Sequence, residues 1–168
     1  MQIQRKNILK RYKWLNEKKR SFIISADYDG AICASFLRHH LKWDLVGYYN
    51  FNSIWLSKKA LDNKKELIWV DLNILPLSSR SIGGQIVSLK NETPNGFKTS
   101  CNANILASIT NENFNQKFPF STLLFLMWMH NIDLKMSDIG KLLILNSDNT
   151  WMKIQKYKEY VNWWKTLL

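Results

Sequence analysis

The chain has 168 residues, 46% of them hydrophobic and 13% aromatic, which excludes an intrinsically disordered protein and predicts one folded domain over residues 1–168. Lys and Arg number 24 against 13 Asp and Glu. The resulting charge of +11 favours nucleic acid or another phosphate-bearing ligand as the partner, with a protein partner as an alternative. Two isolated cysteines, Cys33 and Cys101, argue against a disulfide framework and a zinc cluster, and the longest apolar run, Phe120–Met129, is too short to span a membrane, so we expect a cytoplasmic protein.

Residues 1–20 predict a basic amphipathic helix. Eight Lys or Arg accompany a single Glu, while apolar residues recur every three to four positions. We expect its cations to contact nucleic-acid phosphates, and the alternative is a docked helix whose lysines are only solvated. The candidate nucleic-acid-binding residues are Arg5, Lys6, Lys10, Arg11 and Lys13.

Residues 21–90 predict an α/β core. A helical pattern at Ala31–Leu41 follows the first of several short apolar runs, and the links between the runs are long enough for parallel crossovers. The predicted fold class is therefore α/β, with a parallel-core sheet flanked by helices. The expected parallel strands are Phe22–Ala26, Leu45–Tyr49 and Leu67–Asp71, with a further strand at Gln85–Leu89.

Residues 91–168 predict a mainly helical C-terminal part after a turn at Glu92–Gly96. The aromatic stripe of the last predicted helix is typical of a buried face. The alternative is that these rings, and those in Lys10–Trp14, stack on bases beside the neighbouring lysines. The expected helices are Asn102–Thr110, Phe120–His130 and Trp151–Leu168.

The start of the apolar helix near Phe120 has two interpretations. Lys117 and Ser121 or Thr122 could bind an anion at the positive end of the helix. The simpler interpretation is a proline and a serine, Pro119 and Ser121, that begin a buried helix, and we favour it.

Two acids follow the first predicted strand, and a third follows a later one. Asp27 and Asp29, one residue apart, come directly after the strand, and Asp71 ends Leu67–Asp71. The carboxyl ends of neighbouring parallel strands meet at one sheet edge, and close carboxylates repel unless a cation or a proton lies between them. The pattern predicts a divalent metal site with Asp27, Asp29 and Asp71 as ligands. The alternative is an Asp that caps a helix, followed by a turn at Gly30.

The segments ISADYDGAICASFL (Ile24–Leu37) and IWVDL (Ile68–Leu72) resemble the first and second motifs of the DHH phosphoesterase superfamily, over roughly residues 20–90. This resemblance implies an α/β domain that binds two manganese or magnesium ions, whose bound water attacks a phosphodiester or phosphoanhydride. It also implies that Asp27 and Asp29 are metal ligands and that Asp71 bridges the metals.

The chain departs from the pattern of this superfamily at the ligands. Ser25 stands where nuclease members carry another acid, and the His-His motif is absent: Gly83, Gly84 and Gln85 fall in its expected place. The chain's histidines are elsewhere, at His39, His40 and His130.

These departures favour a degenerate DHH-like protein with weak or no catalysis that binds nucleic acid or a phosphate-bearing ligand, of the kind found in phage or defence systems. One alternative is an active Mn- or Mg-dependent phosphoesterase or nuclease with Asp27, Asp29 and Asp71 as catalytic residues. Another is a HAD-type phosphatase, in which Asp27 would attack phosphorus and Asp29 would act as acid and base. Asp148 would then be the late acid, although Lys141 lies too close to it for the usual order of motifs.

Overall fold

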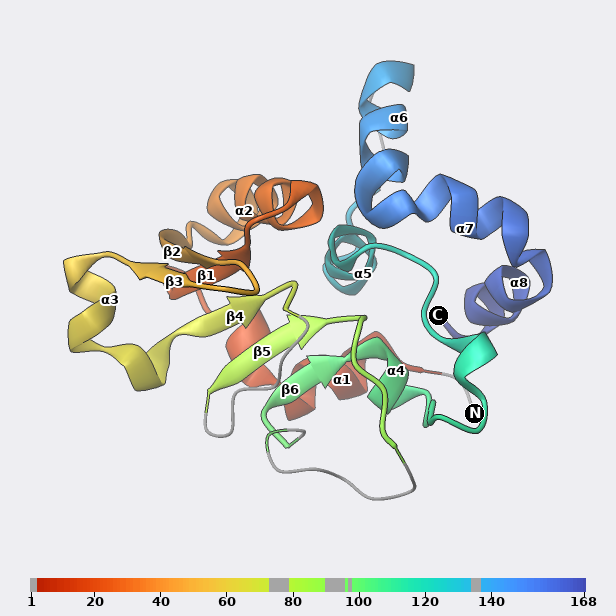
Figure 1. Cartoon of the computed structure of the whole chain (residues 1–168), viewed down its shortest axis with the longest axis horizontal. Coiled ribbons are helices and arrows are strands. Elements are labelled where there is room, and N and C mark those ends of the chain that lie inside the picture. Colours follow the sequence, from red (N-terminus) through yellow and green to blue (C-terminus); the bar gives the residue numbers. More distant parts are fainter. Residues whose placement is uncertain (1–2, 73–78, 90–95, 97, 134–136) are drawn as a thin grey trace.

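The centre of the structure is a mostly parallel β-sheet (Figure 1). A computed structural model describes residues 3–72, 79–89, 96, 98–133 and 137–168, and within these residues the sheet has six strands in the order β3-β2-β1-β4-β5-β6. Neighbouring strands are parallel except β2 and β3, which form an antiparallel pair at one edge. The strands are β1 (Ser21–Ser25), β2 (Asp44–Tyr49), β3 (Ile54–Leu56), β4 (Ile68–Val70), β5 (Arg80–Gly83) and β6 (Ser100–Asn102).

The first three predicted strands are neighbours in this sheet. Phe22 of β1 pairs in parallel with Leu45 of β2 on one side and with Ile68 of β4 on the other. The strand order therefore reverses between β1 and β4. In open α/β sheets, ligands bind outside the carboxyl ends of the strands at such a reversal. The prediction of an α/β fold with a parallel core is confirmed.

The predicted strand at Gln85–Leu89 is wrong. The parallel strand next to β4 is β5, which ends at Gly83, and Ser88 takes part in an isolated bridge with Thr110 outside the named strands. β6 was not predicted. Both β5 and β6 are short and carry buried serines, and Ser81 Oγ donates to Ser100 Oγ at 2.7 Å. Such strands lack the apolar run by which a buried strand is recognised in a sequence.

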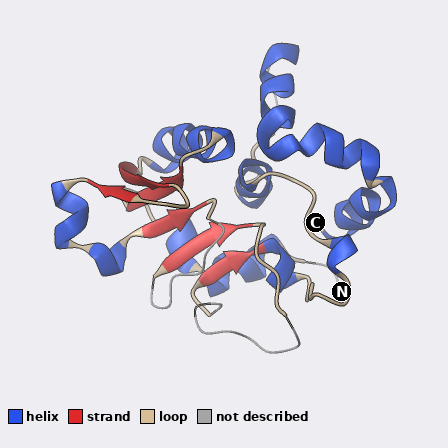
Figure 2. Ribbon diagram, in the orientation of Figure 1, coloured by secondary structure: helices blue, strands red, loops and turns tan. Residues whose placement is uncertain are grey.

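Helices flank the sheet and form most of the C-terminal half, as predicted (Figure 2). α5 lies between the sheet and the C-terminal helices, and α6 extends away from the sheet at the top of Figure 1. Over the described residues, no helix combines the length and the apolar character that crossing a membrane requires. The helices are α1 (Arg5–Arg11), α2 (Tyr28–Leu41), α3 (Lys58–Asp62), α4 (Ala103–Leu106), α5 (Thr122–Met129), α6 (Asp138–Asn146), α7 (Thr150–Lys156) and α8 (Lys158–Leu167).

Several predicted helices differ in extent from those observed. The basic N-terminal helix stops at Arg11, because the buried Tyr12 leaves the helical conformation (φ −110°), and a 3₁₀ turn follows at Lys13–Asn16. The C-terminal helix is divided into α7 and α8 at Tyr157 (φ −123°). The helix predicted at residues 102–110 is reduced to α4, and α6 was not predicted. Apart from Gly96, the predicted turn at residues 92–96 lies outside the described residues.

The two faces of the sheet carry separate apolar clusters, because successive side chains of a strand point to opposite faces. Phe22 and Ile24 of β1 belong to the larger cluster, to which α1, α2, α5 and α8 contribute. Ile23 belongs to a smaller cluster with Val46 of β2 and Ala60 of α3. The helices that carry the candidate site are therefore fixed to the sheet through the larger cluster.

The C-terminal aromatic stripe is buried only in its second half. Val161 and Trp164 of α8 lie in the interior, whereas Trp151 is 52% exposed and Tyr157 is 40% exposed. The break at Tyr157 therefore separates an exposed half of the stripe, on α7, from a buried half, on α8. The predicted core role therefore applies to α8 and not to α7.

Candidate functional site

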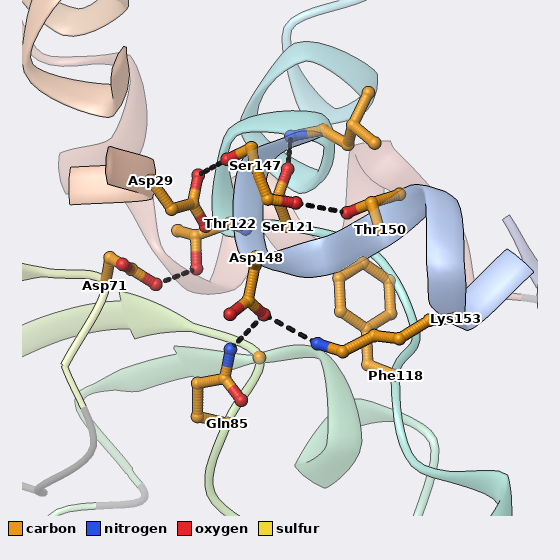
Figure 3. Close-up of polar contacts among 12 residues, drawn as sticks. Asp29, Asp71, Gln85, Phe118, Ser121, Thr122, Ser147, Asp148, Thr150 and Lys153 are labelled. Carbon is orange, nitrogen blue, oxygen red and sulfur yellow. Dashed lines mark hydrogen bonds and ion pairs between the residues drawn. The ribbon is translucent and has the colours of Figure 1, made fainter. Parts of the chain in front are cut away.

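Asp27, Asp29 and Asp71 lie at the carboxyl ends of β1 and β4, where the strand order reverses. Two hydroxyl residues connect the three acids. Ser25 contacts Asp27 and Asp71. Thr122, at the start of α5, contacts Asp29 through its backbone N–H and Asp71 through its hydroxyl, and Figure 3 shows the contact with Asp71. The three carboxylates therefore belong to one hydrogen-bond network.

Asp27 is the N-cap of α2. Its Oδ1 accepts a hydrogen bond from the Gly30 backbone N–H at 2.8 Å and lies 2.9 Å from Ser25 Oγ. Because β1 has already ended at Ser25 and α2 begins at Tyr28, Asp27 and Asp29 do not extend from one strand in a shared direction. Asp27 is exposed and Asp29 is buried, so the helix-cap interpretation describes Asp27.

Asp29, in the first turn of α2, is 3% exposed and faces the N-terminus of α5. The backbone N–H groups of Thr122 and Leu123 donate to its carboxylate at 2.7 Å and 3.2 Å, and Ser147 Oγ donates at 2.7 Å. The first N–H groups of a helix lack partners within the helix, and its positive end favours an anion. The anion at this helix start is a carboxylate of the same chain.

The other residues of the suggested anion site have different partners. Ser121 is the N-cap of α5, and its Oγ accepts from the Leu124 N–H at 3.2 Å. Pro119 precedes this cap. Lys117 lies with its Nζ over the ring of Phe114, at 5.0 Å from the centroid. Ser121 therefore begins α5 as an ordinary N-cap, as the simpler interpretation predicted, and Lys117 packs on Phe114.

Asp71 is buried between two hydroxyl groups. It has a left-handed backbone conformation (φ 57°), which Asp and Asn adopt more readily than most residues. Thr122 Oγ1 donates to Asp71 Oδ1 at 2.6 Å, and Ser25 Oγ lies 2.7 Å from Oδ2. Burial, and next the nearby charge of Asp29, raise the pKa of Asp71 to about 7.

The contacts of Ser25 are compatible with a proton on Asp71. Ser25 Oγ is close to carboxylate oxygens of both Asp27 and Asp71, but a hydroxyl has one hydrogen to donate. Both contacts are satisfied when Asp71 is protonated and donates to Ser25, which donates to Asp27. Burial raises the pKa of Asp29 as well, yet its hydrogen bonds from Ser147, Thr122 and Leu123 favour its charged form. At pH values below about 7, a proton on Asp71 relieves the repulsion between Asp29 and Asp71, and the N-terminus of α5 stabilises the charge of Asp29.

A second polar group, Gln85, Asp148 and Lys153, lies beside this network (Figure 3). Gln85 follows the end of β5 and donates through Nε2 to Asp148, and Lys153 Nζ of α7 lies 2.8 Å from Asp148 Oδ2. The charge of Asp148 contributes to the raised pKa of Asp29. Gln85 thus comes from the segment where the His-His motif was expected, and it contacts an acid from the C-terminal helices.

The HAD-type alternative finds no support in these contacts. It needs Asp29 to exchange protons with a substrate, but both oxygens of the buried Asp29 already accept hydrogen bonds from inside the protein. Lys141 pairs with Asp138 at 3.2 Å, and the lysine beside Asp148 is Lys153.

The glycine of the D-x-D-G segment is required by packing. Gly30 lies within α2, and a Cβ added to it would be 2.6 Å from Ser25 Oγ and closer still to the Ser25 carbonyl oxygen. The helix can therefore approach the end of β1 only if residue 30 has no side chain. This explanation replaces the tight turn that the sequence suggested for Gly30.

We expect Gly30→Ala to lower the free energy of unfolding by about 3 kcal/mol, because backbone atoms must move to relieve the clash. The control is Gly83→Ala at the end of β5, where the nearest atom lies 3.7 Å from the added Cβ. We expect the control to change stability by about 0.5 kcal/mol or less. Urea unfolding of both variants measures the difference, and equal stabilities would contradict the packing explanation.

The histidines lie away from the carboxylates. His39 and His40 occupy the last turn of α2, about 16 Å along the helix from Asp29 at a rise of ~1.5 Å per residue. His40 packs against His130, with ring centroids 4.9 Å apart, and burial lowers the pKa of His130 to about 4.

A metal centre has little support from the arrangement of side chains. Within the part of the chain that the structure describes, no three His, Cys, Asp or Glu side chains form a group that could hold a metal ion. The oxygens of Asp29 and Asp71 are engaged by internal hydrogen bonds. As arranged, these residues do not fit the pair of manganese or magnesium ions that the DHH resemblance implies.

The candidate nucleic-acid-binding residues lie on α1 and the turn after it. Lys6, Lys10, Arg11 and Lys13 are exposed, and none of them forms an ion pair with the described residues. Arg5 differs from them, because its guanidinium donates to Asn131 and lies over the ring of Trp128. Arg5 is therefore partly committed to contacts inside the protein.

Comparison of the chain with protein-family models, with curated proteins and with solved structures finds no significant match in any of the three. What can be inferred about function therefore rests on the geometry of the chain itself.

The structure adds residues to the site that the sequence motifs did not predict. The sequence motifs assign no role to Ser147, and they assign other roles to Thr122, Asp148 and the segment that contains Lys153. Their common signal is a polar residue at the start of a helical pattern, as in Ser121–Thr122 and in the Asn146–Thr150 segment between α6 and α7. That signal is common to most helix starts, so it does not identify which acid the helix faces.

Proposed function

We propose that the chain is a divergent relative of the DHH phosphoesterases that binds nucleic acid or another phosphate-bearing ligand and has weak or no hydrolytic activity. One observation carries this proposal. The acids of the D-x-D-G segment are used internally, Asp27 as the cap of α2 and Asp29 as the partner of the α5 N-terminus. The strongly cationic surface remains available for a ligand.

The expectation of weak catalysis follows from the hydrogen bonds of the carboxylates. Two-metal hydrolysis needs several carboxylate oxygens free to coordinate cations and to orient the attacking water. Here a proton and the start of a helix balance the charges of Asp71 and Asp29, and no imidazole lies beside them. A metal ion would have to displace the hydrogen bonds of Thr122 and Ser147, at a cost in folding free energy.

The expectation of a phosphate-bearing partner rests on charge. The net charge is +11, and Lys10, Arg11 and Lys13 present exposed cations on one short stretch of the chain. Lys and Arg on a surface release condensed counterions when they contact phosphates, which drives binding without sequence preference. A reducing compartment such as the cytoplasm would suit this role, since Cys33 and Cys101 are buried free thiols.

The salt dependence of oligonucleotide binding tests this proposal. We expect a short single-stranded oligonucleotide to bind at low salt. Replacing Lys10, Arg11 and Lys13 with Gln should flatten the log–log salt slope by about two units, at roughly 0.7 per phosphate contact. The matched control replaces Lys58, Lys64 and Lys65 with Gln. These exposed lysines lie in α3 and in the turn after it, and their replacement removes the same amount of charge. Fluorescence anisotropy over a range of salt concentrations measures both slopes.

Two results would contradict the proposal. If no oligonucleotide or nucleotide binds even at low salt, the charge serves another purpose. If the bound oligonucleotide is hydrolysed rapidly with Mn²⁺, and Asp71→Asn abolishes the hydrolysis, the active phosphoesterase is the better description.

A further inference from the structure

A cavity of about 840 Å³ lies between the segment around Phe114–Pro119 and the α7–α8 junction. Its volume falls in the range of ~300–1,000 Å³ that is usual for small-molecule sites. The C-terminal helices that form one wall pack against the body through Trp164, whose Nε1 donates to the Gln116 carbonyl at 2.8 Å. Asn115 Nδ2 also donates to Tyr160 Oη across the cavity wall, at 2.7 Å. Both walls are therefore connected by hydrogen bonds.

The charged residues that line this cavity are all positive. Lys117, Lys153 and Lys156 line it, and its described lining residues include no Asp or Glu. Lys153 is paired with Asp148, whereas Lys117 and Lys156 form no ion pair with the described residues. Two ammonium groups are thus available for an anion inside a concave, mostly apolar site.

Aromatic rings stand beside these cations. Lys117 Nζ lies 5.0 Å from the ring centroid of Phe114, and Lys156 Nζ lies 5.3 Å from that of Tyr157. Phe114 is 48% exposed and Tyr157 is 40% exposed, so these large rings remain accessible. Flat apolar surface and positive charge at this separation match a ligand that joins an aromatic base to a phosphate.

Side-chain contacts link the cavity to the end of β5. Lys153 lines the cavity and contacts Asp148, which accepts a hydrogen bond from Gln85 after β5. These two side-chain contacts connect a ligand in the cavity with the carboxyl edge of the sheet, where α/β folds bind their ligands.

We infer that this cavity binds a nucleoside phosphate, with Tyr157 and Phe114 against the base and Lys117 and Lys156 at the phosphate. The ligand is either a free nucleotide or one nucleotide of a single strand. This inference rests on the proposed function and assigns it a site that is separate from α1.

The test measures binding of dTMP and of a short fluorescent oligothymidylate at low salt. We expect Tyr157→Leu to weaken binding about tenfold, because it removes a stacking surface, and Tyr157→Trp to retain it. Lys117→Gln with Lys156→Gln should reduce the salt slope for the oligonucleotide by about 1.4, at ~0.7 per phosphate contact. The matched control is Lys158→Gln, an exposed lysine close by that does not line the cavity.

The outcomes separate the inference from the function on which it rests. If the cavity substitutions weaken the binding of both probes, the site accepts free nucleotides. If they weaken the binding of the oligonucleotide alone, the ligand is a single strand. Oligonucleotide binding that survives the cavity substitutions but falls with Lys10, Arg11 and Lys13 overturns the cavity and leaves the proposed function. If neither dTMP nor the oligonucleotide binds, the cavity inference and the proposed function are both overturned. Unfolding curves of each variant establish that the fold is intact.

Discussion

Replacing Asp29 with alanine is expected to lower the free energy of unfolding by about 3–5 kcal/mol at pH 7. The substitution leaves the Thr122 and Leu123 N–H groups and the Ser147 hydroxyl without their acceptor in a buried place, and each such group costs about 1–3 kcal/mol. It also removes the contact that joins the first turn of α2 to the start of α5. Urea or guanidinium unfolding followed by tryptophan fluorescence measures the loss.

The matched control is Asp27→Ala, a change of the same kind two residues earlier. Asp27 is exposed, and its loss removes the cap of α2 and a contact with Ser25, whose hydroxyl keeps Asp71 as a partner. We therefore expect a cost of about 1 kcal/mol. Asp29→Asn, which keeps one acceptor oxygen, should fall between the two. Similar losses for Asp27→Ala and Asp29→Ala would mean that the α5 contact contributes little, and the explanation given for this motif would fail.

Replacing Asp71 with asparagine is expected to stabilise the protein at pH 8 by up to about 4 kcal/mol, while changing little near pH 4. The pKa of Asp71 is raised from its ordinary value of 3.8 to about 7 in the folded protein, mainly by burial and then by Asp29. Between these values the folded chain keeps a proton that the unfolded chain has released. Stability therefore falls as the pH rises from about 4 to about 7, and it stays at the lower level above that.

Asparagine resembles the protonated acid, because it carries no charge and tolerates the left-handed backbone of residue 71 (φ 57°). Its amide can exchange hydrogen bonds with Ser25 and Thr122, whose hydroxyls rotate to donate or to accept. The difference in unfolding free energy between the variant and the original chain should therefore grow from pH 4 to pH 7 and then level off. Chemical unfolding at a series of pH values measures this curve, and a difference that does not depend on pH would contradict a proton on Asp71.

Asp29 and Asp71 are two buried acids whose negative charges would repel each other. The charge of Asp29 raises the pKa of Asp71, and both side chains are buried. A metal ion is one way to relieve such repulsion. In this chain the N-terminus of α5 stabilises the charge of Asp29, and a proton on Asp71 removes the second charge at pH values below about 7. Both features support the proposal of weak or no hydrolytic activity.

The interior of the sheet was predictable because buried parallel strands are short apolar runs. Phe22–Ala26, Leu45–Tyr49 and Leu67–Asp71 carry that signal, and their parallel pairing followed from the length of the links between them. β5 and β6 were not predicted, because their buried positions include Ser81 and Ser100 in place of apolar residues. These two hydroxyls form a hydrogen bond across the sheet between residues that are 19 positions apart in the sequence. A local pattern cannot report such a partner.

The fold class, the position of the three acids just after β1 and β4 and the excess of positive charge can all be read from the order of residues along the chain. The role of the acids cannot, because it depends on contacts between distant segments. Asp29 meets Thr122 and Ser147, which follow it by 93 and 118 positions, through the packing of α5 and the C-terminal helices against α2. A carboxylate that binds a metal and a carboxylate that accepts hydrogen bonds from the N-terminus of a helix can have the same local sequence. The hydrogen-bond donors that distinguish the two cases come close only when the chain folds.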